Sequence, residues 1–247
     1  YLVYGLFEQM FSERLHELGE KKSCPYMQAG AGYGGFLARP VAAYQMYVVA
    51  KEGKAMEALE AMMLENRRLQ QHGFLQTELD RAKESLLEQY ARAAKEESKT
   101  ESGRFASELV DYFLDQVPAP GAVIENKWAK QMIESITLEE VNALIGKWMT
   151  EENFVCTISM PEKKGVKVPT EEKVLKAIEK CKKANTKAWV DNVKTEPFLA
   201  QEPKAGKIES TTKNEKFDYT EYTLSNGAKV IVKKTNFKND EILTYAV

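Results

Sequence analysis

The sequence contains only two histidines, and neither lies in a pattern that would bind a catalytic metal. His16-Glu17 begins like a helical zinc motif, in which a second histidine follows the first by four positions. Position 20 is Glu20, so we interpret His16 as one member of a pair on a helix surface. His72 stands just before Gly73, where a cationic side chain suits the C-terminal end of a helix. We therefore predict no catalytic residue, no metal ligand and no bound cofactor in this chain.

A glycine-rich segment matches the spacing of some dinucleotide-binding loops. Gly30-Ala31-Gly32-Tyr33-Gly34-Gly35 fits G-x-G-x-x-G, which lets the backbone approach pyrophosphate at a helix N-terminus. Here the segment continues through residues 36–40 into a run typical of a strand, so no helix follows to bind the phosphate. We predict a close-packed bend between two strands instead of a nucleotide site.

The remaining nucleophiles and acids form no pattern that marks an active site. Cys24, Cys156 and Cys181 are odd in number, far apart and outside C-x-x-C spacing, which indicates reduced thiols. No serine, threonine or cysteine can be paired with a histidine from the sequence, although members of a triad can be distant. No pattern marks two of the 37 carboxylates as an acid–base pair. The residues alone do not name a function.

The composition excludes several classes of function. Thirty-five basic residues against 37 acidic ones give a formal charge of −2, which is too balanced for a general nucleic-acid or anionic-membrane binder. No apolar run approaches the roughly 20 residues of a membrane helix, and the first residues lack the features of a signal peptide. Because the chain has no initiator methionine and ends in an unfinished strand-like run, we expect a fragment of a longer protein.

The hydrophobic pattern of residues 1–161 predicts an α+β fold, an antiparallel sheet backed by long helices. Apolar residues recur every three or four positions from Tyr4 to Leu18, which is the buried stripe of a helix that Gly19 ends. Segments 26–38 and 43–49 are rich in aromatic and β-branched residues and predict a pair of antiparallel strands. Further helices are expected at 56–72, from Thr77, at 105–113, at 123–133 and after the capping box Thr137-Leu-Glu-Glu140, with a last strand at 154–160.

A change of composition after Pro161 predicts three parts. Residues 1–161 form the α+β domain, and residues 162–218 are expected to be a lysine-rich linker with one helix starting at Thr170-Glu171-Glu172. The lysine-rich run 162–187 has no aromatic residue on which bases could stack, so its lysines indicate a solvated face and no nucleic-acid partner. Residues 219–247 carry a hairpin signal at Asn226-Gly227 and are expected to be the first strands of a further domain.

Four motifs in residues 1–161 follow one another in a distinctive order. They are Phe11-Ser-Glu-Arg14-Leu15-His-Glu-Leu18 with Tyr26, the helix from Ala58-Leu59 to Gly73, Thr77-Glu78-Leu79-Asp80-Arg81-Ala82-Lys83, and Ile136-Thr137-Leu138-Glu139-Glu140-Val141-Asn142. Together they resemble the second, non-catalytic domain of the pitrilysin and insulysin family of zinc metallopeptidases, the inverted zincins, which include the mitochondrial processing peptidases. Residues 222–230, with Asn226-Gly227, are similar to the Leu-x-Asn-Gly hairpin that opens a new repeat in this family.

The resemblance implies a function for the parent protein. Family members consist of two halves that close around a peptide, and one half carries zinc. The chain would be an internal fragment that contributes a structural, chamber-forming domain to proteolysis of peptides or unfolded segments. Zinc is expected in the parent and not in the fragment. The implied partners are the other domains of the parent and a peptide substrate, and bacterial relatives often act in the periplasm or cell envelope.

Two alternatives remain open at this point. The parent could be a catalytically dead, peptidase-like subunit used for binding or assembly, as one partner of the processing peptidases is. The chain could also be an unrelated α+β ligand-binding domain. The sequence upstream of Tyr1 separates the first alternative from the enzyme, because an active parent carries the family's zinc motif there.

Two departures from the family pattern bear on the site. The family's zinc motif is His-x-x-Glu-His with a distant glutamate, and neither His16 nor His72 lies in such a motif. An arginine and tyrosine pair holds the substrate backbone in family members. Tyr26 matches the tyrosine, but Gly19 occupies the arginine's place. Tyr26 is therefore the candidate substrate-binding residue, with packing in the core favoured, and the lost arginine suits a domain of the zinc-bearing half.

Overall fold

The computed structural model describes residues 1–150, 152–161, 163, 165–193, 199, 201–236 and 242–246. The chain divides into two compact units, Tyr1–Asn192 and Val193–Val247. The first unit holds the helices and one antiparallel strand pair, and the second holds three short strands. Together, the helices and the antiparallel strands confirm the predicted α+β class.

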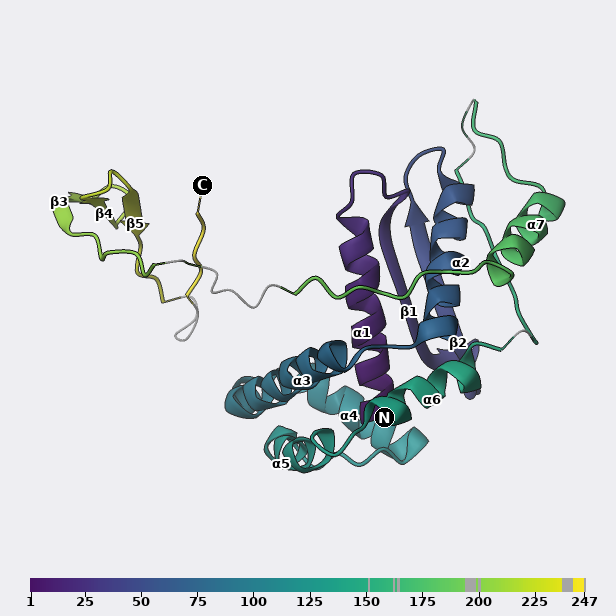
Figure 1. Cartoon of the computed structure of the whole chain (residues 1–247). Helices are drawn as coiled ribbons and strands as arrows, with labels where there is room; N and C mark the ends of the chain where they lie inside the picture. The colour runs from purple at the N-terminus through teal and green to yellow at the C-terminus, as the bar shows by residue number, and fades with distance from the viewer. Residues whose placement is uncertain are drawn as a thin grey trace. The chain divides into compact units, whose positions relative to one another are not determined.

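The first unit is built on a strand pair covered by two helices. Helix α1 (Leu2–Gly19) packs against β1 (Tyr26–Phe36), and α2 (Ala55–His72) packs against β2 (Ala38–Ala50) (Figure 1). The two strands are antiparallel, with Tyr33 opposite Tyr44 in the register. Leu37 makes the reversal between them with a φ of 61°. The segments predicted at 26–38 and 43–49 therefore form the expected strand pair.

A second group of helices in this unit comes directly after α2 in the sequence. Helix α3 (Gln76–Glu96) and the short η1 (Glu97–Lys99) lead to α4 (Ser102–Asp115), α5 (Ala122–Ile133) and α6 (Leu138–Trp148). Helix α3 packs against α5 and α1, and α6 packs against α1 (Figure 1). The predicted capping box is present, because Thr137 N donates to Glu140 Oε2 at 2.8 Å and Glu140 N donates to Thr137 Oγ1 at 3.2 Å.

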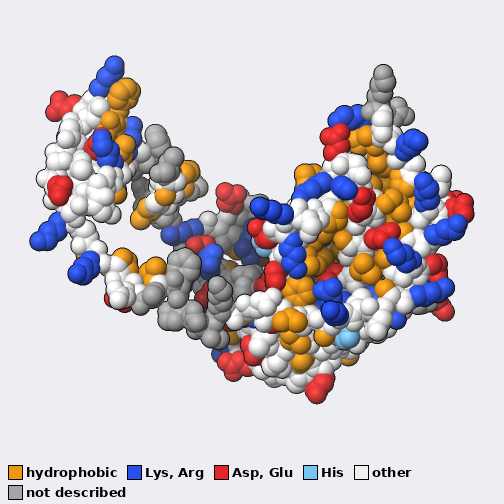
Figure 2. Space-filling view, turned by 45° about the horizontal axis from the view of Figure 1, so that its top comes forward, with side chains coloured by type: hydrophobic (Ala, Val, Ile, Leu, Met, Phe, Trp, Pro, Cys, Tyr) orange, Lys and Arg blue, Asp and Glu red, His pale blue; other side chains and the backbone are white. Residues whose placement is uncertain are grey.

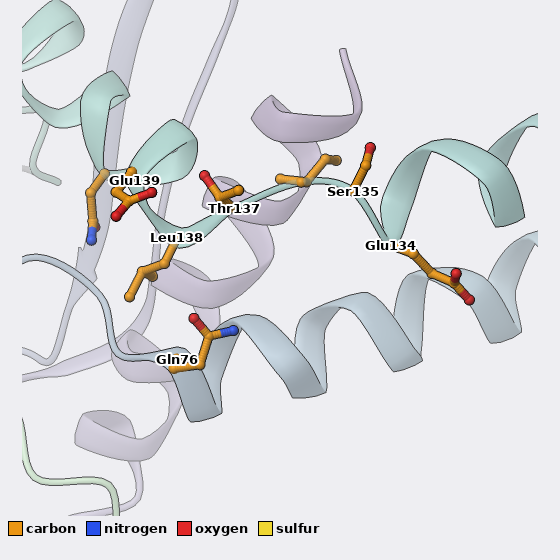
Figure 3. Close-up of a pocket in the computed structure, with 8 residues that line it drawn as sticks. Gln76, Glu134, Ser135, Thr137, Leu138 and Glu139 are labelled. Carbon is orange, nitrogen blue, oxygen red and sulfur yellow. The ribbon is translucent and has the colours of Figure 1, made fainter.

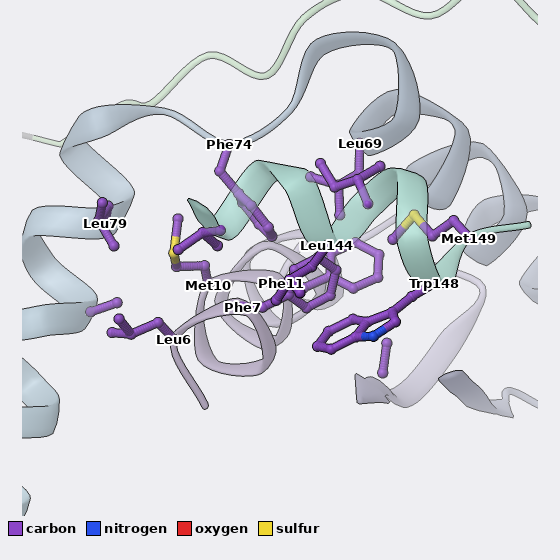
Figure 4. Packing of buried hydrophobic residues seen from close by; sticks show 14 of the residues in the cluster. Leu6, Phe7, Met10, Phe11, Leu69, Phe74, Leu79, Leu144, Trp148 and Met149 are labelled. Atoms are coloured by element: carbon purple, nitrogen blue, oxygen red, sulfur yellow. The ribbon is translucent and has the colours of Figure 1, made fainter. Parts of the chain in front are cut away.

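The main core lies where α1, α3, α6 and the strand pair meet. In Figure 4, Phe7 and Phe11 of α1 lie against Leu144 and Trp148 of α6. Tyr33 of β1 stacks on the Trp148 ring with a centroid distance of 4.7 Å. Burying such large side chains is the main favourable term in folding. Other members of the core are Leu6, Met10, Leu15, Ala31, Met62, Leu69, Phe74, Leu79, Ala82, Ile136, Val141, Ile145 and Met149.

Helix α7 (Glu171–Lys182) is the helix expected within the lysine-rich segment, and it packs against α2. The Thr170 side chain accepts from Lys173 N at the helix start, as the Thr-Glu-Glu sequence predicts. Ile178 and Cys181 are buried against Met63 of α2. On the face of the unit that Figure 2 shows, lysine and arginine side chains are interspersed with acidic ones. No large patch of a single charge is visible there.

Two local predictions for the first unit are wrong. Residues 154–160 were expected to form a strand, but they have no regular structure. A strand is stable only when a neighbour satisfies its backbone groups, and no described strand pairs with this segment. The glycines of residues 30–35 were expected to form a bend, but they lie inside β1. There the space above Gly30 is taken by the ring of Tyr47 from β2, and the reversal falls at Leu37.

The second unit is a three-stranded antiparallel sheet in the order β3–β4–β5. The predicted hairpin is present as β4 (Tyr219–Leu224) and β5 (Lys229–Val232), with Gly227 at a φ of 83° in the turn. Strand β3 (Ile208–Asn214) pairs with β4 within the segment expected to be linker. Its side chains are mostly polar and exposed, so the hydrophobic pattern carried no signal for a strand.

Candidate functional site

Three charged side chains of the first unit are buried together at the turn between α2 and α3. Arg14 lies on the apolar stripe of α1, three positions after Phe11, and is 1% exposed. Its Nε donates to Glu78 Oε1 at 2.5 Å and its Nη2 donates to Glu78 Oε2 at 2.6 Å. This bidentate geometry is the strongest form of the arginine–carboxylate interaction. The pair joins two of the four motifs that carry the family resemblance.

The same two side chains hold the turn that precedes α3. Arg14 Nη2 also donates to the Gly73 carbonyl at 3.0 Å, and Glu78 Oε2 accepts from Leu75 N at 2.8 Å. Asn142 of α6 accepts from Phe74 N at 2.8 Å. Gly73 has a φ of 68° and a ψ of −168°, a conformation open essentially to glycine alone. Side chains of α1, α3 and α6 therefore form hydrogen bonds with the backbone groups of this turn.

A second carboxylate, Glu65 of α2, completes the cluster and is 2% exposed. Glu65 Oε2 lies 3.0 Å from Arg68 Nη1, and Glu65 Oε1 lies 3.9 Å from Arg14 Nη1. Neither Glu65 Oε1 nor Arg14 Nη1 has a hydrogen-bond partner within the described part of the chain. Burial raises the pKa of Glu65 above its ordinary value of 4.5, although Arg68 and Arg14 act to lower it.

Aromatic rings enclose the arginine of this cluster. The Arg14 guanidinium lies 4.9 Å from the centre of the Phe74 ring and 5.2 Å from the centre of the Trp189 ring. Arg68 lies 5.7 Å from the centre of the same Trp189 ring. Such contacts are favourable and keep water from the charges. The cluster is therefore a closed set of paired charges that can position backbone, and it exposes no group to attack a substrate.

These charges could not be recognised as a cluster from the sequence, although one signal was present. Arg14 and Glu65 occupy positions that the helical period assigns to the buried side, three residues after Phe11 and Met62. A charge at such a position must be paired within the fold, because burying it alone is very costly. The partner itself is set by the tertiary fold and not by local spacing.

Tyr26, the predicted candidate for substrate contact, lies at the start of β1 and is 3% exposed. Its hydroxyl donates to the Leu15 carbonyl at 2.8 Å, and burial raises its pKa. A Cβ at position 19, where the family has its arginine, would lie 3.6 Å from the Tyr26 ring. Gly19 and Tyr26 are therefore neighbours. A contact between Tyr26 and a substrate stays a prediction.

The two histidines are not brought together. His16 Nε2 lies 4.0 Å from Glu20 Oε1 on the exposed side of α1, as expected for a surface pair. His72 ends α2, as expected, but its ring nitrogen lies 2.7 Å from the Thr186 carbonyl. Among the residues that the structure describes, no three His, Cys, Asp or Glu side chains are placed to hold a metal ion. Within those residues, no helix has the length and apolar character needed to cross a membrane.

An open pocket lies between the start of α3 and the connection from α5 to α6 (Figure 3). Gln76 lies opposite Leu138, and Glu134 points outward. The polar groups there serve the fold: Thr137 caps α6, Asn142 binds Phe74 N, and the Glu134 carbonyl accepts from Lys83. The pocket gathers no set of groups suited to acid–base or nucleophilic chemistry.

Comparisons with known proteins agree with the resemblance. No family model matches the chain. It is 24% identical over 177 residues to a "Zinc protease PQQL-like" of Arabidopsis thaliana, covering 71% of this chain and 18% of that protein. The periplasmic protease PqqL from Escherichia coli superposes with a TM-score of 0.66 at 20% identity, covering 96% of this chain and 26% of that one. An insulinase family protease from Yersinia pestis gives 0.59 at 13% identity, covering 73% and 38%.

These findings bear on the resemblance and on the fold. They confirm the resemblance to zinc proteases of the pitrilysin and insulysin type, and the structural likenesses show that the fold is theirs. The chain spans about a fifth of the curated relative and about a quarter of PqqL.

Glu65 makes a specific pH dependence testable. Its folded-state pKa is raised, so the folded chain binds the proton more tightly than the unfolded chain, and ionisation of Glu65 lowers stability as pH rises above about 4.5. We expect the free energy of unfolding of Glu65→Gln, relative to the natural chain, to increase from pH 4.5 to pH 8. Urea denaturation over this range measures the difference.

Glu57 on the same helix is the matched control with the opposite sign. Its hydrogen bond with Lys54 lowers its pKa, so the stability it contributes is present above its unfolded pKa and is lost as pH falls. Relative to the natural chain, Glu57→Gln should therefore lose stability as pH rises toward about 4.5, and the difference should then stay nearly constant up to pH 8. A Glu65→Gln difference that follows the Glu57→Gln trend would contradict the account.

Proposed function

We propose that this chain is a structural, chamber-forming domain of a two-half zinc metallopeptidase that cleaves peptides or unfolded segments, and that the zinc site lies elsewhere in the parent. The observation that carries the proposal is the Arg14–Glu78 pair, which links two separate family motifs inside the fold. The motif residues Leu15, Leu79 and Val141 are also buried in the core. Residues that mark the family are used here to build a framework.

The side chains that the structure describes do not fit a catalytic zinc site. A peptidase zinc needs two imidazoles and a carboxylate on one centre, with an open position for water. His16 is exposed on α1, and His72 binds the Thr186 carbonyl at the end of α2. We therefore assign no catalytic step to this chain. In the parent, we infer that zinc is held by residues outside it.

The partners follow from the same proposal. The other domains of the parent chain would contact this unit, and a peptide would be enclosed between the two halves. We infer no nucleic-acid partner, because 35 basic residues against 37 acidic ones leave the chain without a general positive charge. The periplasm or cell envelope is the proposed location, on the analogy of the periplasmic protease PqqL.

The proposal is tested with the chain and with the sequence of its parent. After dialysis, the chain should retain no stoichiometric zinc by atomic absorption and should not hydrolyse an unfolded casein substrate. The sequence upstream of Tyr1 should carry His-x-x-Glu-His. Retained zinc with hydrolysis would overturn the structural role. Substitution of the upstream motif would favour the alternative, a peptidase-like subunit that binds or assembles without cleaving.

Tyr26 offers a second test, made in the parent enzyme. Tyr26→Phe removes the hydroxyl that binds the Leu15 carbonyl, so it should cost about 0.5–1.5 kcal/mol of stability. If Tyr26 serves packing alone, kcat/KM for a peptide should stay within about twofold of the natural enzyme, because no transition-state contact is lost. A rise in KM of tenfold or more, with the fold intact by circular dichroism, would assign Tyr26 to substrate binding.

A further inference from the structure

The segment that follows α7 has no helix or strand, yet it is bound along the first unit through specific contacts. We call residues 184–192 the strap. Ordering such an extended segment costs backbone entropy at every residue, so it stays in place only where contacts offset that cost. The contacts fall at three points, one at each end and one in the middle.

The first anchor is the last turn of α2. Gln71 Oε1 accepts from Thr186 N at 2.9 Å and from Thr186 Oγ1 at 2.6 Å. Gln71 Nε2 and Arg67 Nε donate to the Ala184 carbonyl at 3.2 and 3.4 Å. With His72 against the Thr186 carbonyl, three side chains of α2 bind the strap backbone. Most of these contacts are made to backbone groups of the strap. Thr186 is the one strap residue that also contributes its side chain to them.

The middle anchor is Trp189, which is 8% exposed although Val190 beside it is 69% exposed. The ring covers the guanidinium groups of Arg14 and Arg68. Beneath it lies the cluster whose Arg14 Nη1 and Glu65 Oε1 lack hydrogen-bond partners among the described residues. The ring therefore closes a site where water would otherwise hydrate buried charges.

The last anchor is Asp191, bound at the first turns of α3. Its Oδ2 accepts from Arg81 Nη1 at 2.8 Å and also from the Thr77 hydroxyl, and its Oδ1 accepts from Arg81 Nη2 at 3.4 Å. A carboxylate near a helix N-terminus is further favoured by the helix dipole. Thr77 and Arg81 belong to the third family motif, so this motif binds the strap on one side and Arg14 on the other.

We propose that the strap is a latch that fixes the point at which the chain leaves the first unit, and that Trp189 seals the Arg14–Glu65–Glu78 cluster. While the strap is bound, residues 184–192 keep one path along the first unit. Releasing the strap would expose Glu65 and Arg14 to water and loosen the turn at Gly73. In the parent, on the proposed function above, the latch would limit how the chain after Asn192 follows movement of the two halves.

Limited trypsin digestion of the full 247-residue chain tests the latch directly. Lys187 lies in the strap and Lys204 lies outside it, and both are exposed residues in segments without helix or strand. Cleavage in a folded protein follows the population of locally opened states. We expect Lys187 to be cut at least tenfold more slowly than Lys204, measured by mass spectrometry of the fragments.

Three variants separate the latch from general stability. Trp189→Ala and Asp191→Asn should each raise cleavage at Lys187 about tenfold without changing cleavage at Lys204. The exposed neighbour supplies the control, because Val190→Ala should leave both rates unchanged. If Trp189→Ala loses its helical circular dichroism, the test of the latch rests on Asp191→Asn, because that variant leaves the Trp189 ring in place. Equal cleavage at Lys187 and Lys204 in the natural chain, or no effect of Asp191→Asn, would overturn the proposal.

Discussion

The buried pair of Arg14 and Glu78 is the constraint on which the first unit depends. Removing two charges from water is costly, and only short, well-directed hydrogen bonds offset that cost. The bidentate contact, at 2.5 and 2.6 Å, requires α1 and the start of α3 to take one relative position. The same groups bind the Gly73 carbonyl and Leu75 N. The turn from α2 to α3 is thereby fixed, and the large side chains of α1 are held against the core.

Helices and turns that are specified by nearby residues could be predicted from the sequence. The apolar stripe of residues 4–18 predicts α1, the Thr137 capping box predicts the start of α6, and Asn226-Gly227 predicts the hairpin of β4 and β5. Residues 154–160 have the composition of a strand but no described partner, and β3 has a partner but no hydrophobic pattern. Whether a segment forms a strand depends on its neighbours, which local sequence does not specify.

The buried charges, too, could be predicted only where they depend on nearby residues. Helical period places Arg14 and Glu65 on buried faces, but Glu78 is their neighbour only because the fold brings α3 to α1. Arg14 and Glu78 each lie in a motif that carries the family resemblance. The motifs alone do not show that these two side chains are partners. The role of Trp189 could not be predicted from the sequence either, since it lies in a segment without a helical or strand pattern, and yet its ring covers two arginines. The distinctive charges of the first unit face inward, which supports the proposed framework role.

A double-mutant cycle tests the central role of the Arg14–Glu78 pair most directly. The free energies of unfolding of the natural chain, Arg14→Met, Glu78→Gln and the double variant are measured by urea denaturation. If the two side chains stabilise the unit as a pair, the single changes will be strongly non-additive, with a coupling free energy of about 2 kcal/mol or more. A coupling within about 0.5 kcal/mol of zero would contradict the account, because each side chain would then act independently of the other.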